Sequence, residues 1–169
     1  PGNQTKNQGV TLTLSSTKPT RTGYTFKYWN ASIGGTYNPG GSYTHDQDGG
    51  TVTMTAYWKD ETAPSCSTFT ATPNSWSKGN GTVTIKAKDE GSGISSIVLK
   101  RYSYVTGTWS DIKSWTSINS TSEVTKTYSQ TTEGVFLYQV VITDVAGNKT
   151  TKNSSVVYLD HTKPVINGA

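Results

Sequence analysis

The sequence is poor in the side chains on which most reaction chemistry depends. Its 169 residues contain one cysteine and two histidines. Cys66 has no partner for an internal disulfide, and one cysteine with two distant histidines cannot complete a tetrahedral zinc site. A Ser-His-Asp triad would need His45 or His161, which fall in a turn-rich loop and in a linker. We therefore expect no enzymatic activity and no cofactor.

Charge and long apolar runs are also scarce. Only 15% of the residues are charged, and the net charge of +4 comes without a cluster of Lys and Arg, so we expect no nucleic-acid partner. No apolar run is long enough to cross a bilayer, which predicts no membrane insertion by this segment. No stretch shows helical apolar periodicity, whereas Ser and Thr supply 50 positions and Tyr and Trp another 15. This composition predicts an all-β fold.

One short motif occurs twice, one module length apart. Asp60, Thr62 and Pro64 recur as Asp160, Thr162 and Pro164, a displacement of 100 residues. A motif that returns at module spacing indicates linkers between domains. We expect one module at residues 1–58, a second at 59–164, and the start of a following module at 165–169. The chain is then a segment of a longer tandem array.

The first module has three alternating stretches, at 10–14, 24–29 and 52–58. In the second stretch, Tyr24, Phe26 and Tyr28 alternate with other residues and Trp29 stands at the strand end. The period of two places the first three rings on one face of a strand. Because the module is too small for an aliphatic core, we expect aromatic rings to fill it, with Trp29 and Trp58 in the core.

The stretch PTRTGYTFKYW, followed by GGTYNPGGSY and closed by TMTAYW, resembles the Listeria–Bacteroides repeat, also called the internalin B-repeat. The resemblance covers about residues 9–58. It implies a small β-grasp-like sheet from an extracellular bacterial surface protein. Tyr28 stands where the family usually has glycine. The opening strand and Asn-Gly-Gly turn of the family are missing upstream of Val10, so we expect a module that is incomplete at its N-terminus.

The second module has short strand candidates at regular intervals, namely 67–72, 81–88, 94–104, 108–116, 122–128, 134–143 and 150–159. Seven short strands in about 100 residues predict an immunoglobulin-like β-sandwich. In the sixth candidate, one face carries Phe136, Tyr138, Val140 and Ile142. The other face, with Leu137 and Val141, is also apolar, which predicts a central strand covered on both sides.

Two turns in this module, KDEGSGIS at 88–95 and YQVVITDVAGN at 138–148, resemble those of the bacterial immunoglobulin-like repeats of surface adhesins. The flanking Asp-x-Thr-x-Pro linkers are also typical of that family. The resemblance covers residues 60–164. It implies a β-sandwich that serves mostly as a spacer in cell-surface or secreted proteins.

Four aspartates are candidate calcium ligands: Asp60, Asp89, Asp144 and Asp160. Two or three of them could converge on a calcium ion, a hard cation that takes six to eight oxygens, and rigidify a linker. The alternative is that Asp89 and Asp144 accept backbone N–H bonds in their own turns, as Asx residues do. No Asp-x-Asp-x-Asp loop is present to decide between the two.

Four aromatic residues around Thr106-Gly107 are candidate ligand-binding residues: Tyr102, Tyr104, Trp109 and Trp115. Exposed, coplanar rings at this place would stack on sugar faces. Buried rings would instead be part of the packing of the sheet.

These features predict a non-catalytic segment of a bacterial cell-surface or secreted multidomain protein, acting as a spacer or adhesion module. Its partners would be a host or cell-surface protein or glycan and the neighbouring modules of the same chain. The alternative is a carbohydrate-binding accessory module of a secreted carbohydrate-active enzyme. Both functions place the chain outside the cell.

Overall fold

The computed structural model describes residues 1–163 and 165. The chain forms two compact units, Pro1–Glu61 (unit 1) and Thr62–Ala169 (unit 2). The predicted all-β class is confirmed, since strands make up 51% of the structure and its described residues hold no helix. None of these residues forms a helix able to span a membrane. The expected start of a following module, 165–169, lies outside the described residues except for Val165.

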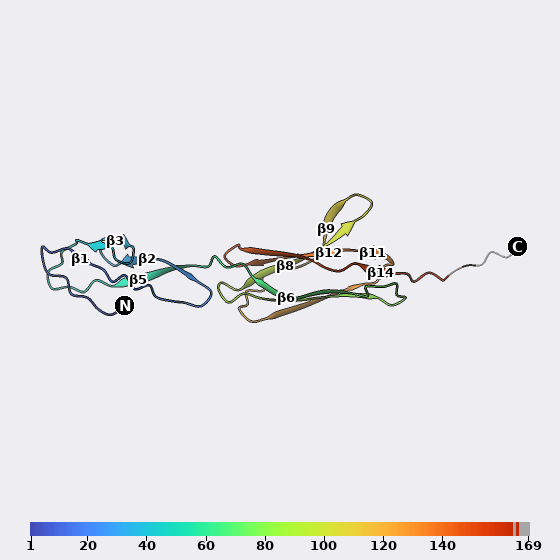
Figure 1. The fold of residues 1–169 in the computed structure, drawn as a ribbon, viewed down its shortest axis with the longest axis horizontal. Helices are drawn as coiled ribbons and strands as arrows, with labels where there is room; N and C mark the ends of the chain where they lie inside the picture. Colours follow the sequence, from blue (N-terminus) through green and yellow to red (C-terminus); the bar gives the residue numbers. More distant parts are fainter. Residues whose placement is uncertain (164, 166–169) are drawn as a thin grey trace. The chain divides into compact units, whose positions relative to one another are not determined.

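Unit 1 contains two small antiparallel sheets (Figure 1). The larger has the order β3 (Gly35–Tyr37), β2 (Thr25–Ala31), β5 (Met54–Lys59), and the smaller pairs β1 (Leu12–Thr13) with β4 (Ser42–Tyr43). The strand expected at 10–14 is therefore only two residues long. Strands β3 and β4 form in glycine-rich stretches, because pairing with β2 and β1 supplies their hydrogen bonds.

An irregularity in the pairing of β2 with β5 decides which rings share a face in unit 1. The register shifts between Phe26 and Tyr28, so Phe26 pairs with Trp58 while Tyr28 pairs with Tyr57. Because one residue is inserted, successive rings change sides. Phe26 lies 5.0 Å from Trp29, centroid to centroid, and Tyr28 stacks on Tyr57 at 4.7 Å. The expectation that Phe26 and Tyr28 share a face is therefore wrong.

The core of unit 1 is small and partly aromatic. Trp29 is buried, with 9% of its surface exposed, as the sequence predicted. Trp58 is only half-buried, because it lies near the end of β5 and contacts Phe26 edge-on at 5.7 Å. The prediction that Trp58 is a core residue is therefore corrected. A second group of side chains packs beside them: Leu14, Ala31 and Tyr43, with Leu12, Tyr37, Val52 and Met54 around it.

Unit 2 contains two main sheets. One has the order β10 (Val124–Gln130), β7 (Gly81–Lys88), β6 (Ser65–Thr72), and the other β13 (Lys149–Asn153), β12 (Tyr138–Asp144), β8 (Ile94–Ser103), β9 (Thr108–Trp115). A short pair joins β11 (Gly134–Phe136) to β14 (Val157–Leu159). Two predicted strands are each split, 134–143 at Leu137 and 150–159 at residues 154–156. If each split pair is counted as one strand, unit 2 has seven strands among its described residues. The first, second and fifth form one sheet, and the third, fourth, sixth and seventh form the other. This is the arrangement of an immunoglobulin-like sandwich.

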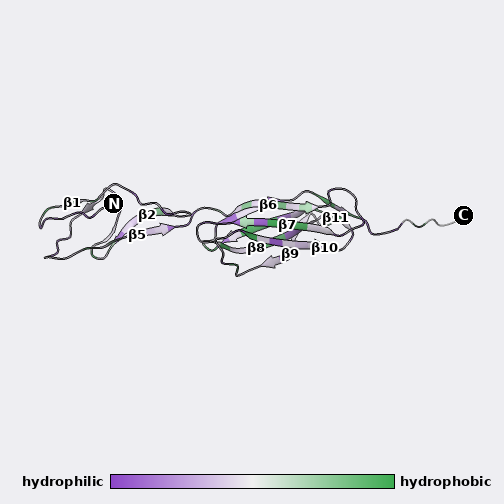
Figure 2. Cartoon of the chain, turned by 90° about the horizontal axis from the view of Figure 1, so that it is seen from below, coloured by the Kyte–Doolittle hydropathy of each residue, from purple (hydrophilic) through white to green (hydrophobic). Residues whose placement is uncertain are grey.

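The core of unit 2 lies between these sheets. Alternate residues of β7 and β12 are buried, including Ile85, Tyr138 and Ile142, none of which exposes measurable surface. Figure 2 shows the resulting alternation of hydrophobic and hydrophilic residues along the strands. The opposite face of β12, with Leu137 and Val141, is only half-buried. The expectation of a strand covered on both sides is wrong, because nothing among the described residues of unit 2 forms a third layer over that face.

Candidate functional site

The turn after β7 is built on Asp89. This side chain is 3% exposed, and its carboxylate accepts a hydrogen bond of 2.7 Å from the backbone N–H of Gly93. Gly93 has a φ of +89°, and a Cβ there would lie 2.9 Å from the backbone carbon of Ser120. Glycine is therefore required at this position for both its backbone conformation and its lack of a side chain.

The turn after β12 is built in the same way on Asp144, which is 2% exposed. Its carboxylate accepts hydrogen bonds from the backbone N–H of Asn148 at 2.7 Å and from the Asn148 Nδ2 at 2.8 Å. The prediction that Asp89 and Asp144 bond to backbone amides of their own turns is confirmed by these contacts.

The two turns also bind one another. The backbone N–H of Val145 donates to the carbonyl of Gly93 at 2.9 Å, and that of Ala146 donates to the Ser92 hydroxyl at 3.0 Å. The Ser-Gly-Ile and Ala-Gly-Asn motifs, 54 residues apart in the sequence, thus form one hydrogen-bonded corner of the sandwich.

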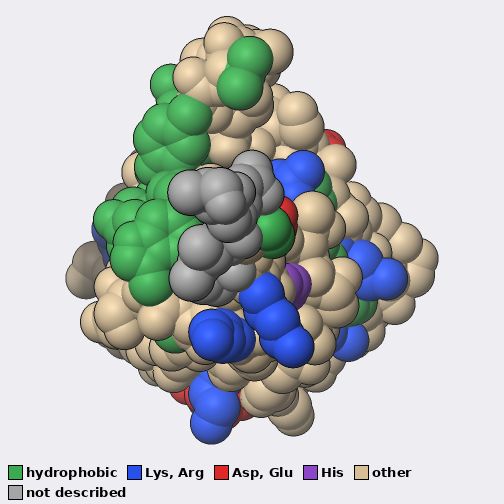
Figure 3. Space-filling model, turned by 90° about the vertical axis from the view of Figure 1, so that its right-hand side faces the viewer, with side chains coloured by type: hydrophobic (Ala, Val, Ile, Leu, Met, Phe, Trp, Pro, Cys, Tyr) green, Lys and Arg blue, Asp and Glu red, His purple; other side chains and the backbone are tan. Residues whose placement is uncertain are grey.

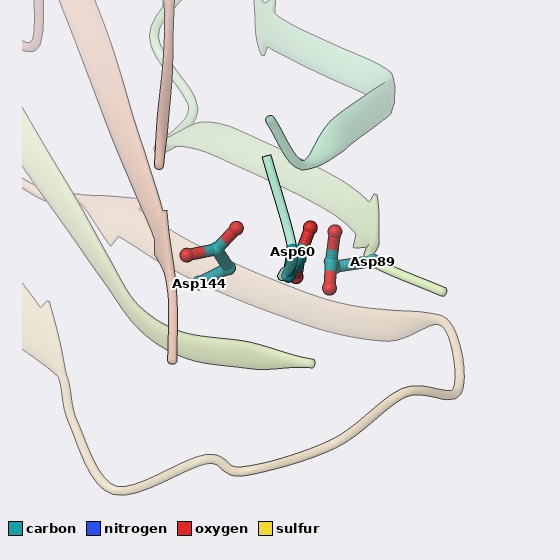
Figure 4. A group of neighbouring side chains, drawn as sticks. All are labelled: Asp60, Asp89 and Asp144. Atoms are coloured by element: carbon teal, nitrogen blue, oxygen red, sulfur yellow. The ribbon is translucent and has the colours of Figure 1, made fainter. Parts of the chain in front are cut away.

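Three of the four candidate calcium ligands lie close together. One carboxylate oxygen from each of Asp60, Asp89 and Asp144 lies within 4.8 Å of the others, and all three residues are buried (Figure 4). An all-oxygen donor set of this kind suits a hard cation such as calcium and does not suit zinc. The carboxylates of Asp89 and Asp144 also accept the turn hydrogen bonds described above, so these two aspartates have a structural role in the absence of a metal.

Asp160 does not join this group of carboxylates. It is exposed, and its carboxylate accepts a hydrogen bond of 3.0 Å from the backbone N–H of Thr162, two residues away. The sequence singled out Asp160 because it repeats Asp60 at the second linker. The repeated motif therefore places its two aspartates in different surroundings.

Three of the four candidate aromatic residues gather at the β8–β9 hairpin. Tyr102 lies 5.1 Å from Tyr104 and 5.2 Å from Trp109, with ring planes inclined by 88° and 57°. Tyr104 is 57% exposed, whereas Tyr102 and Trp109 are half-buried. The rings are therefore not coplanar, and they form an edge-to-face cluster, which is the arrangement that aromatic rings favour among themselves.

The fourth aromatic candidate, Trp115, packs against the hydrophobic core of unit 2 together with Ile112. A different ring, Trp76, is 64% exposed and lies 5.4 Å from Tyr158. Sequence reasoning missed Trp76, although its polar neighbours in the stretch PNSWSKGN were a signal that no strand buries it. Figure 3 shows hydrophobic side chains gathered on one side of the face from which residues 160–163 leave unit 2.

Unit 1 carries an open hollow of about 600 Å³. Its lining combines apolar side chains, among them Leu14, Trp29 and Met54, with His45 and the ion-paired Lys6 and Asp46. The Lys6 ammonium, helped by the backbone N–H of Gly9, lowers the pKa of the Asp46 carboxyl. Because Asp46 is already bonded to Lys6 and to the Gly9 amide, it is not placed to act as a general base in this hollow.

Comparison with known proteins places unit 2 in a family. A family model described as a domain of unknown function, DUF7743, matches residues 58–167, which include the first linker, both turn motifs and the second linker. Comparison with curated proteins gave no match. Since the matched residues make up more than half of the chain, this protein belongs to the DUF7743 family.

Proposed function

We propose that this chain is a non-catalytic segment of a bacterial cell-surface or secreted multidomain protein, where it acts as a spacer and adhesion module. The observation that carries the proposal is that unit 2 binds the backbone of both of its linkers. A domain that fixes the direction of the chain on both sides is suited to joining other domains.

The first linker is held by side chains from the end of the sandwich at which β13 begins. Asn148 Nδ2 donates to the carbonyl of Thr62 at 3.4 Å, and the Thr150 hydroxyl donates to the carbonyl of Pro64. Pro64 has no backbone N–H and biases the residue before it toward extended backbone. These contacts make the first linker part of the fold of unit 2.

The second linker is held by Glu133. Its carboxylate accepts hydrogen bonds from the backbone N–H of His161 at 3.1 Å and from the Thr162 hydroxyl at 2.7 Å. The backbone N–H of Asp160 also donates to the carbonyl of Ser77 at 3.0 Å. The two linkers leave unit 2 at opposite ends (Figure 1), as a domain in a tandem array requires.

Binding and turnover assays on the same preparation test this proposal. We expect no hydrolysis of polysaccharide or peptide substrates, and weak binding of the single chain to cells or extracellular matrix. Beads that carry many copies should bind far more strongly, because linked weak sites gain avidity without any new contact. Turnover of any substrate by the purified chain would contradict the proposal, as would equally weak binding of the multivalent beads.

The alternative proposal is a carbohydrate-binding module, which is favoured by the 57% exposure of Tyr104 on the hairpin. The steep angles between the hairpin rings count against it, because a sugar chain stacks best on rings in one plane. A glycan array decides between the two. Strong binding to one sugar class that Tyr104→Ala abolishes and Trp76→Ala retains would favour the carbohydrate-binding function.

A further inference from the structure

We propose that unit 2 is a tension-bearing domain. Its first and last strands lie side by side, and tension on the chain loads the hydrogen bonds between them in shear. The inference rests on the proposed function, because a spacer between a surface and an attached partner transmits any force that acts on that partner. It concerns β6 at the start of unit 2 and the β13–β14 segment at its end.

Side chains of the last strands donate hydrogen bonds to backbone carbonyls of the first strand. Lys152 Nζ donates to the carbonyl of Cys66 at 2.7 Å, and the Ser155 hydroxyl donates to that of Ala71 at 3.0 Å. The bond from Thr150 to the carbonyl of Pro64 belongs to the same series. From one bond to the next, the donor residue and the acceptor residue both lie further toward the C-terminus. The two strands therefore run parallel.

A backbone bridge continues this parallel contact. Ser77 pairs in parallel with Leu159, through hydrogen bonds from Ser77 N–H to the Tyr158 carbonyl at 3.2 Å and from Asp160 N–H to the Ser77 carbonyl at 3.0 Å. Val157 and Leu159 of β14 are each 1% exposed, so sliding this strand out of place also exposes apolar side chains.

The direction of the strands determines how these bonds carry load. The chain enters unit 2 at one end and leaves it at the other (Figure 1). Tension on the two linkers therefore pulls β6 and β14 in opposite directions along their own axes. All five bonds link the two segments side by side, so sliding one segment past the other loads them together. A hairpin pulled apart at its open end would instead lose its bonds one after another.

Single-molecule force spectroscopy on the full chain, held by its two ends, tests the inference. Thr150→Val, Lys152→Met and Ser155→Ala each remove one donor and keep most of the side-chain volume. We expect each to raise the unfolding rate of unit 2 at constant force about five- to tenfold, which corresponds to about 1–1.4 kcal/mol for one hydrogen bond. Unit 2 is recognised by its greater gain in length, because it is the longer unit.

Two matched controls separate load-bearing from ordinary stability. Thr151→Val changes the exposed neighbour of Thr150, on the other face of β13, and should leave the unfolding rate under load unchanged. Ile142→Val shortens a fully buried side chain of β12, away from the two end strands. It should lower the thermal stability of unit 2 at least as much as Thr150→Val does, yet raise the unfolding rate under load less.

The inference is overturned if the three donor variants unfold under load at the parent rate, or if either control accelerates unfolding as much as they do. Failure of the proposed function gives a different result. If the chain shows the expected force response but its multivalent beads bind nothing, unit 2 is a tension-bearing domain and the adhesive role is ruled out.

Discussion

At the level of single residues, aromatic side chains supply much of the hydrophobic packing of unit 1, whereas aliphatic side chains supply most of it in unit 2. Phe26 contacts both Trp29 and Trp58 on one face of β2 and β5, while Tyr28 and Tyr57 stack on the other. Among these five rings Trp29 is the buried one, so we expect it to contribute more than the other four to the stability of unit 1.

Replacing Trp29 with alanine should therefore cost about 3–5 kcal/mol and unfold unit 1. Calorimetry should show the loss of one transition, with the transition of unit 2 intact. Tyr57→Ala is the matched control, because that ring is 48% exposed and its loss should leave unit 1 folded. If Trp29→Ala melted like the parent, the ring would not be part of the core.

The buried aspartates Asp89 and Asp144 hold the turns after β7 and β12, and substitution of Asp144 tests this role. If their main role is to hold the turns, Asp144→Asn should cost less stability than Asp144→Ala, because an amide oxygen can still accept the Asn148 N–H although the bond from the Asn148 Nδ2 is lost. Asp144→Ala should cost about 1–3 kcal/mol. Added calcium or a chelator should leave the melting temperature of the parent unchanged. A chelator-induced fall, absent in Asp144→Asn, would instead assign the three carboxylates to a calcium ion.

At the level of secondary-structure elements, two glycines of the turns after β7 and β12 allow two costs in stability to be measured separately. One is the cost of backbone strain, and the other is the cost of steric crowding. Gly93 and Gly147 have similar φ angles, +89° and +93°. A Cβ at Gly93 would meet the backbone of Ser120 at 2.9 Å, whereas at Gly147 it would meet nothing within 4 Å.

Gly147→Ala should therefore cost only the strain of a left-handed backbone, about 1–2 kcal/mol. Gly93→Ala should cost clearly more, because the backbone of Ser120 must also move. Denaturant unfolding of the two variants measures the difference. Equal losses of stability would mean that the approach of Gly93 to Ser120 is not a tight one in solution.

The second linker should respond to pH through Glu133. Hydrogen bonds from the Thr162 hydroxyl and the His161 backbone N–H lower its pKa below the usual 4.5. A carboxyl with a lowered pKa in the folded state stabilises that state at higher pH, and this contribution is lost as the pH falls through the lowered value. The amide signals of His161 and Thr162 should therefore titrate below pH 4.5. They should stop doing so in Glu133→Gln, and a midpoint above 4.5 in the parent would contradict the contact.

Some strands of unit 2 could be predicted from the sequence because they carry their own alternation of apolar and polar residues. The stretch 81–88 is an example, since Val83, Ile85 and Ala87 are all buried. The break at Leu137 could not be predicted. The apolar pattern runs on through that residue, but β11 pairs with β14 while β12 pairs with β8 and β13.

Unit 1 was less predictable, since pairing partners decide its structure. The shift in register between Phe26 and Tyr28 depends on β5, 30 residues away in the sequence, and no local pattern marks it. In the candidate site, the turn roles of Asp89 and Asp144 followed from their glycine-rich surroundings. The approach of Asp60 to these residues, and the exposure of Trp76, depend on contacts between distant segments.

At the scale of the whole molecule, the chain consists of two units of different construction. Unit 1 relies on a few rings and short strands, and unit 2 on a continuous core between two sheets. The DUF7743 match extends from residue 58 to 167, so it includes all of both linker motifs along with the sandwich. The linkers are therefore best regarded as part of the domain.

Measurement of ¹⁵N relaxation on the full chain in solution tests whether unit 2 holds its own linkers in place. The amides of Thr62, His161 and Thr162 should have order parameters near the value of about 0.85 that is typical of rigid backbone. Values below about 0.6 at these residues, beside a rigid sandwich, would show that the linkers are flexible and that unit 2 does not hold them in place.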